Sequence, residues 1–114
     1  MNIQRSKHEG VTVLAPSGRI DTTTSGSVEE VIRQTVDGGA RDLVVDFGHV
    51  EYISSAGLRV FLLLAKRMRD LQGRLVLCGM PEPVRQVFRL AGFMPLFTVE
   101  SSRDAALAKL AAQT

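Results

Sequence analysis

Two adjacent serines, Ser54 and Ser55, have the side chains in this 114-residue sequence best placed to carry out chemistry. They follow a short apolar run, Leu43–Phe47, and a turn-like pair, Gly48–His49, and they precede a helical pattern that begins near Leu58. The segment around them is therefore predicted to be a loop that brings both hydroxyls to the start of a helix. A hydroxyl there can accept from the unpaired N–H groups of the first turn. The same helix end suits an added phosphate, because its N–H groups and positive dipole face outward. A helix cap and a phosphoacceptor both fit these residues.

The sequence offers little for catalysis. A serine nucleophile needs a base within hydrogen-bond reach, and the only histidines are His8, in a predicted hairpin, and His49, in a predicted turn. The nucleophile-elbow motif G-x-S-x-G is not matched, because Ile53 stands two residues before Ser55. The glycine-rich phosphate loops and clusters with metal-ligand spacing are also missing. We therefore expect no enzyme activity, no cofactor and no metal site.

Composition narrows the remaining classes of protein. Hydrophobic residues at 45% and charged residues at 23% are ordinary for one globular domain. A net charge of +2 is too small for a dedicated nucleic-acid binder. The single cysteine, Cys78, excludes an internal disulfide and lies in an apolar run where a buried thiol is expected. No apolar run reaches membrane-spanning length, so we expect a cytoplasmic protein without membrane insertion.

Strand and helix patterns alternate along the chain and must position the two serines. Beta-branched residues and alternation favour strands, helical spacing of apolar residues favours helices, and Gly and Pro separate them. The first predicted elements are a hairpin over Ile3–Ala15 ended by Pro16 and Gly18, a polar loop over Gly18–Thr24, and a helix from a Ser27–Glu30 capping box to Gly38–Gly39. A strand over Leu43–Phe47, a helix over Ser55–Leu71 and a strand over Leu75–Cys78 follow. The last are a helix opened by Pro81 or Pro83 and ended at Gly92, a strand over Leu96–Val99, and a helix after Ser101–Asp104.

The order ββαβαβαβα predicts a single α/β domain over residues 1–114. Its mixed sheet should join an N-terminal antiparallel hairpin to parallel strands through right-handed crossovers, packed with about four helices. Loops at the carboxyl ends of parallel strands gather on one edge of such a sheet. The Gly18–Thr24 loop and the two serines are therefore expected to share one surface, which favours a binding module over an enzyme.

Three sequence anchors carry a resemblance to a known family. They are Gly18–Asp21, then Leu43–Phe47 leading to Tyr52–Leu58, then Val84–Phe88 with Ala91–Phe93. The chain resembles the STAS domain over almost its whole length, and most closely the free-standing anti-sigma factor antagonists of bacteria. The middle anchor is specific to the family, and the other two fall in the correct order.

The resemblance implies a partner-switching function. Such proteins bind an anti-sigma factor that is also a serine-protein kinase and thereby release a sigma factor. The kinase disables the antagonist by phosphorylating a serine at the start of the second helix, and a PP2C-type phosphatase restores it. The phosphoacceptor of the family falls on Ser55, with Ser54 as the alternative, and Asp21 matches an acidic residue of the neighbouring loop. The partner-binding residues expected on this basis are Asp21, Thr22, Thr23, Ser54, Ser55, Ala56, Gly57 and Arg59.

Two positions depart from the pattern of the family. Many members have Asp directly before the acceptor and Ser directly after it, where this chain has Ser54 and Ala56. The absence of Asp removes a negative charge beside the phosphate and leaves Ser54 as a competing acceptor.

We expect a monomer or weak dimer. The alternative function is a STAS interaction module in another system, such as a phospholipid-transport complex or the control of a signalling enzyme.

Overall fold

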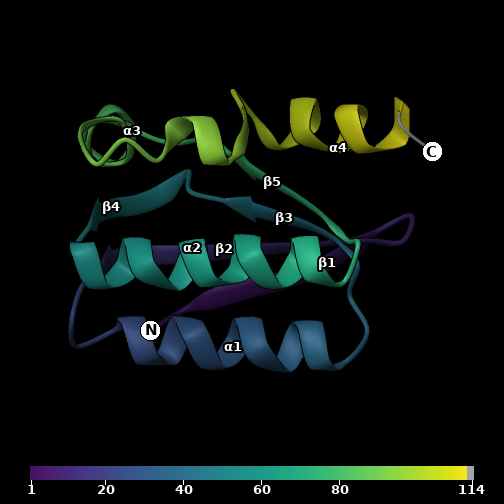
Figure 1. The fold of residues 1–114 in the computed structure, drawn as a ribbon, viewed down its shortest axis with the longest axis horizontal. Coiled ribbons are helices and arrows are strands. Elements are labelled where there is room, and N and C mark those ends of the chain that lie inside the picture. Colours follow the sequence, from purple (N-terminus) through teal and green to yellow (C-terminus); the bar gives the residue numbers. More distant parts are fainter. Residues whose placement is uncertain (113–114) are drawn as a thin grey trace.

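A six-stranded mixed sheet forms the centre of the computed structural model, which describes residues 1–112 (Figure 1). Five strands lie in the order β1-β2-β3-β5-β6, and β4 pairs with β2 off this path. β1 and β2 are antiparallel, whereas the other pairs are parallel. The strands are β1 (Ile3–His8), β2 (Val11–Ile20), β3 (Asp42–Asp46), β4 (His49–Ile53), β5 (Arg74–Cys78) and β6 (Thr98–Glu100).

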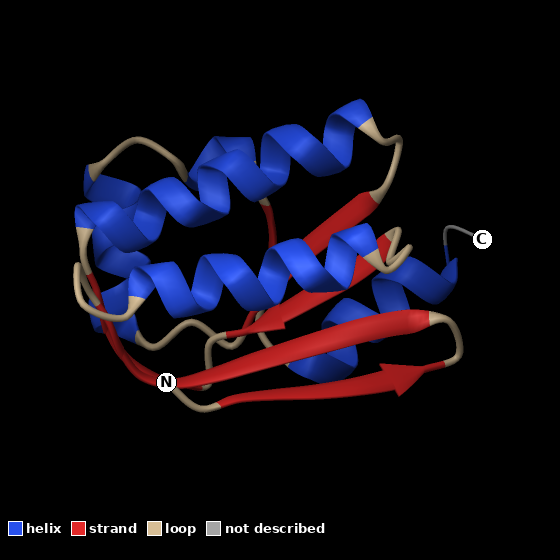
Figure 2. Ribbon diagram, turned by 90° about the horizontal axis from the view of Figure 1, so that it is seen from below, coloured by secondary structure: helices blue, strands red, loops and turns tan. Residues whose placement is uncertain are grey.

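Helices cover both faces of the sheet. The two longest, α1 and α2, lie side by side on one face, and α4 packs on the other (Figure 2). The helices are α1 (Ser25–Asp37), α2 (Ser55–Asp70), α3 (Glu82–Leu90), a 3-10 turn η1 (Met94–Leu96) and α4 (Arg103–Ala112). The predicted α/β class, mixed sheet and element order are confirmed, with β4 as one additional strand.

The central strand β3 has an apolar middle, Leu43–Val45, between Asp42 and Asp46, and burial on both faces explains this pattern. Leu43 and Val45 face the larger core beneath α1 and α2, while Val44 faces the smaller core beneath α4. All three are at most 1% exposed. A strand buried on both faces has no position for a polar side chain. Phe47, just after the strand, makes edge-to-face contacts with Phe61 and Phe88, whose ring centroids lie 5.0 and 5.9 Å away.

The second strand is longer than predicted, because Pro16 and Gly18 do not end it. Its first half pairs with β3 as far as Leu14, and its second half pairs with β4 from Ser17 onward. Pro16 falls in the gap between these two partners, where no parallel ladder bond needs its missing N–H. The proline therefore marks a change of partner within one strand.

The predicted turn is present at Gly48, but β4 begins directly after it, at His49, and takes up part of the predicted loop that follows. The Asp46 carboxylate accepts from the Gly48 N–H at 2.9 Å, and the Val50 N–H donates to the Phe47 carbonyl at 2.9 Å. These bonds turn the chain sharply after β3. The new strand then pairs with the second half of β2, which β3 leaves free.

The predicted capping box at Ser27 and Glu30 is wrong. The N-cap of α1 is Thr24, three residues before Ser27, and the helix begins at Ser25. The Ser25 N–H already donates to the Asp21 carbonyl at 2.8 Å, so the preceding turn has started the helix before Ser27 is reached. Glu30 instead forms an ion pair with Arg33 along the helix.

Candidate functional site

The carboxyl ends of β2 and β4 bring the predicted site residues together. Ile20 and Ile53 are partners in the parallel ladder, and the Ser54 N–H donates to the Ile20 carbonyl at 2.8 Å. Asp21 and Ser54 therefore leave neighbouring strand ends, one entering the loop before α1 and the other starting α2. The register shifts by one residue between Gly18 and Arg19. Such an irregularity re-aims side chains at a sheet edge.

Asp21 holds its loop together through hydrogen bonds within three residues. One carboxylate oxygen accepts from the Thr23 N–H at 2.9 Å and the Thr23 hydroxyl at 2.6 Å. The Asp21 N–H donates to the Thr24 hydroxyl at 2.9 Å. The Thr24 hydroxyl in turn donates to the Arg19 carbonyl at 2.7 Å. The bonds from Thr23 lower the pKa of the Asp21 carboxyl, so it is negatively charged at neutral pH. Thr22 and Thr23 are exposed on this turn.

The two serines have different environments. Ser54 is the N-cap of α2, and its hydroxyl accepts from the Gly57 N–H at 3.2 Å while its carbonyl accepts from the Leu58 N–H at 2.9 Å. Ser55 is the first residue of the helix and is exposed. Among residues 1–112, no hydrogen bond to the Ser55 hydroxyl is found. Ser54 therefore stabilises the helix end, and Ser55 presents a free hydroxyl in front of it.

Gly57 explains why small residues follow the serines. A Cβ at this position would lie 2.8 Å from side-chain atoms of both Ile20 and Ile53, and 3.0 Å from the Ile20 carbonyl oxygen. Only glycine lets the first turn of α2 approach the two strand ends this closely. The buried Gly57 and the half-buried Ala56 thus fix the position of the helix start beneath the exposed Ser55.

Arg19 and Tyr52 belong to the same surface but were not among the predicted site residues. They are ladder partners on β2 and β4, and the Arg19 guanidinium lies 4.4 Å from the centre of the Tyr52 ring. Arg19 also approaches the Asp21 carboxylate, with Nε 4.0 Å from Oδ2. The pairing depends on β4, which was not predicted, so sequence spacing could not reveal it. The signal in the sequence was an Arg and a Tyr within two of the family anchors.

Arg59 lies one helical turn beyond Ser55 and is exposed. Residues four apart face the same side of a helix, so its guanidinium and the Ser55 hydroxyl share one face of α2. The eight predicted site residues therefore occupy one end of the molecule. Their roles stay predictions, but their proximity is a feature of the structure.

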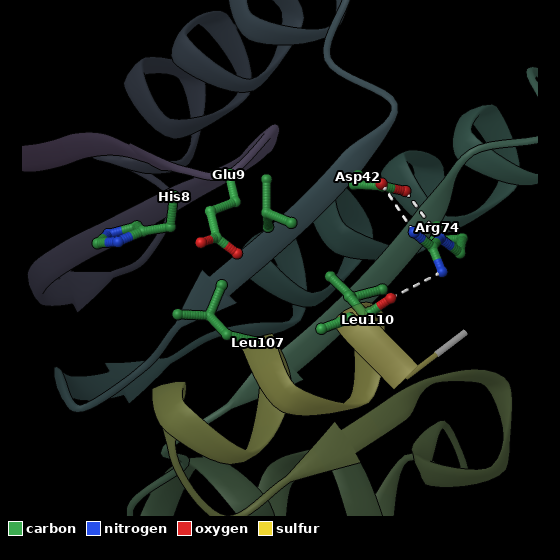
Figure 3. A pocket seen from close by; sticks show the side chains of 8 residues that line it. His8, Glu9, Asp42, Arg74, Leu107 and Leu110 are labelled. Carbon is green, nitrogen blue, oxygen red and sulfur yellow. Dashed lines mark hydrogen bonds and ion pairs between the residues drawn. The ribbon is translucent and has the colours of Figure 1, made fainter. Parts of the chain in front are cut away.

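The histidines do not approach the serines. His49 begins β4 and Ser54 follows the end of that strand, so roughly 15 Å of extended chain separates them. His8 is at the hairpin end of β1 and lines a different cavity, beside Glu9 and the Asp42–Arg74 ion pair (Figure 3). Neither imidazole can act as a base for Ser55 in this arrangement.

Other candidate chemistry is limited in the described part of the chain. Cys78 is fully buried, and burial raises the pKa of its thiol to about 12, as expected of an unreactive core residue. Residues 1–112 contain no group of three His, Cys, Asp or Glu side chains arranged to hold a metal ion. No helix within the same range combines the length and apolar character needed to cross a membrane.

Comparisons with known proteins agree with this arrangement. The STAS domain family model matches residues 2–106. BtrV of Bordetella bronchiseptica, a relative named as an anti-sigma factor antagonist, is 42% identical over 108 residues, which are 95% of this chain and 93% of BtrV. The crystal structure of an anti-sigma factor antagonist from Mycobacterium paratuberculosis is 26% identical, with a TM-score of 0.88 over 95% of this chain and 92% of that one.

The same fold occurs in the phosphorylated form of the Bacillus cell fate determinant SpoIIAA, with a TM-score of 0.73 at 18% identity over 96% of this chain and 99% of that one. The family match covers far more than half of the chain, and the relative with 42% identity spans nearly all of it. The chain belongs to the STAS domain family, in the group of the anti-sigma factor antagonists.

Proposed function

We propose that this protein binds an anti-sigma factor that is also a serine-protein kinase, through the surface around Ser55, and so releases a sigma factor in the cytoplasm. Phosphorylation of Ser55 by that kinase ends the binding, and a PP2C-type phosphatase restores it. The names of the relatives support the antagonist function. The phosphorylated SpoIIAA supports the modification, because it shows that this fold can carry a phosphate.

The observation that carries the proposal is the difference between the two serines. The Ser55 hydroxyl is exposed at the first position of α2, whereas the Ser54 hydroxyl caps the helix. A kinase needs an accessible hydroxyl, and modification of a capping oxygen would disturb the helix end. Ser and Asp are both favourable N-caps. Ser54 can therefore fill the structural role that Asp has in many members of the family while Ser55 receives the phosphate.

The switch needs no refolding of the domain. A phosphate adds about −1.5 to −2 charges at neutral pH, and the exposed N–H groups at the start of α2 can face it. In a close-packed interface the same dianion must lose its water without a matching partner, which is costly. A coupling free energy of ~3–4 kcal/mol would weaken binding by a factor of several hundred, at 1.4 kcal/mol per tenfold change.

The test uses the anti-sigma factor kinase from the native host with ATP. Intact-mass and fragment analysis should find one phosphate on Ser55 in the wild type and in Ser54→Ala, and none in Ser55→Ala. Ser55→Asp should weaken binding of the kinase in calorimetry with almost no change in the melting temperature, because Ser55 is not the cap.

Two outcomes would contradict the proposal. Phosphate on Ser54 in the Ser55→Ala protein would move the acceptor to Ser54. Binding of transporter subunits or of another signalling enzyme, without binding of any anti-sigma factor kinase, would favour the alternative STAS module.

A further inference from the structure

One face of α2 continues from Ser55 along the whole helix. The residues at Ser55, Arg59, Leu63, Lys66 and Asp70 are all exposed. Their spacing of three or four residues places them on a single face of a helix. We call this set the α2 outer face. It connects the proposed phosphoacceptor to the opposite end of the molecule.

Leu63 is the large apolar side chain on the α2 outer face. It is 52% exposed, while Leu64 beside it is buried in the core. Leu63 also borders a shallow groove of about 280 Å³ between α1 and α2, to which Ile32 and Val60 contribute apolar surface. A half-exposed leucine at the edge of an apolar groove offers a place for a side chain of another molecule.

The charges around Leu63 indicate what that molecule should carry. On the groove side, Arg67 and Arg33 are neutralised by ion pairs with Asp37 and Glu30, and Glu29 adds one negative charge at the α1 edge. No ion pair is found for Arg59 or Lys66 within the described part of the chain. An apolar centre thus lies between two positive charges that are available to a partner. Acidic groups spaced around an apolar residue would complement this pattern.

The α2 outer face is better suited to binding the kinase than to binding a second copy of this chain. A two-fold symmetric contact centred on Leu63 would place the same patch against itself and bring Arg59 and Lys66 of both copies into one interface. The α2 outer face is also continuous with Ser55, where the kinase must bind to transfer phosphate. Ser55 and Lys66 are separated by about 16 Å along the helix, a span that one short segment of a partner can cover.

We infer that the anti-sigma factor kinase docks along the α2 outer face with an acidic segment, which places an apolar side chain against Leu63 and carboxylates near Arg59 and Lys66. This inference rests on the proposed function and extends its interface from the helix start to the middle of α2. It makes Leu63 and Lys66 binding residues, in addition to those predicted near Ser55.

The test measures binding of the unphosphorylated protein to that kinase by calorimetry. Leu63→Ala should weaken binding by roughly tenfold, as expected for one well-packed apolar contact. Leu90→Ala is the matched control, because Leu90 is 82% exposed on α3 and should change binding less than about twofold. Lys66→Glu should weaken binding and reduce its dependence on salt concentration. The melting temperatures of all three variants should stay near that of the wild type.

Each result decides between named possibilities. If Ser55→Asp weakens binding but Leu63→Ala and Lys66→Glu do not, the docking inference is wrong and the proposed function stands. If the wild type binds no anti-sigma factor kinase, the proposed function fails and the inference fails with it. If the wild type sediments as a dimer that Leu63→Ala dissociates, the groove is an interface between copies and the inference is overturned.

Discussion

The Asp21 loop and the amino end of β3 hold their charges in different ways. At the end where β2 and β4 finish, the Asp21 carboxylate accepts from Thr23 and Thr24 and lies 4.0 Å from Arg19 Nε, all within three residues of chain. At the start of β3, the two carboxylate oxygens of Asp42 accept from Nε and Nη2 of Arg74, each at 2.8 Å, and the two residues are 32 positions apart in the sequence. Arg74 also donates to the Leu110 carbonyl of α4 at 3.1 Å (Figure 3).

This difference separates a part of the molecule that maintains the fold from the part where we propose that phosphorylation changes the charge. The Asp42–Arg74 pair joins two strands and a helix that are distant in sequence, and both side chains are only 29% exposed. Within residues 1–112, the side chains of the Asp21 loop bond only to neighbours in sequence, and Thr22 and Thr23 are exposed. A phosphate added beside the Asp21 loop therefore meets no tertiary ion pair that it could disrupt. Three substitutions test this division, in order of their expected effect on stability.

The largest effect is expected at Gly57, where the fold and the site share one residue. In Gly57→Ala the new Cβ would press on Ile20 and Ile53, and overpacking of this kind costs about 1–3 kcal/mol of unfolding free energy. Gly26→Ala is the control, because Gly26 is also in the first turn of a helix but has no atom within 4 Å of its added Cβ. That substitution should stabilise the protein by about 0.4–1 kcal/mol. Urea denaturation measures both, and equal effects would refute the packing argument.

A smaller effect is expected at Asp42. Asp42→Asn removes the charge but retains the shape, and it should lower the unfolding free energy by about 1 kcal/mol, since water partly screens the pair. The exposed Asp70, whose carboxylate is 3.9 Å from Arg69, is the control, and Asp70→Asn should leave stability unchanged. Asp42→Asn should not alter binding of the kinase.

The pH dependence gives a second measurement for Asp42. The hydrogen bond from Arg74 lowers the pKa of the Asp42 carboxyl in the folded protein. Its contribution to stability is therefore complete above the unfolded pKa of about 3.9 and is lost as the pH falls through the lower folded pKa. The difference between wild type and Asp42→Asn should shrink in that acidic range. A difference that stays constant down to the lowest pH would show that the charge does not matter.

The smallest effect on stability is expected at Asp21. Asp21→Ala removes only local hydrogen bonds of an exposed loop, so the melting temperature should change less than in Asp42→Asn. Kinase binding or phosphorylation of Ser55 should nevertheless decrease, because the loop beside the proposed phosphoacceptor loses its shape. Normal binding and normal phosphorylation together would remove Asp21 from the site.

The sequence predicted those parts of the fold that depend on strong local patterns. The apolar run of β3, the Glu9–Gly10 turn and the start of α2 near Ser55 follow from burial, backbone preference and capping, all of which are local. The α1 start was misplaced because the Asp21–Thr24 turn began the helix before the capping-box signal at Ser27.

The β4 strand could not be predicted in the same way. Only two of its residues, Val50 and Ile53, are buried, and its partner is the second half of a strand that a proline seemed to have ended. The contact between Arg19 and Tyr52 depends on that pairing and was missed with it. The location of the site was therefore predictable from the sequence, whereas the residues that surround Ser55 in space required the strand register.

Tyr52 also gives the protein an optical signal of its own. It is the single tyrosine, and the sequence contains no tryptophan. Its ring is 37% exposed, lies beneath the Arg19 guanidinium and is three residues from Ser55. Ultraviolet emission excited near 280 nm therefore originates at the proposed switch and nowhere else in the chain. The phosphorylation and dephosphorylation that we propose for Ser55 should therefore change the emission intensity of this one fluorophore in the unlabelled protein.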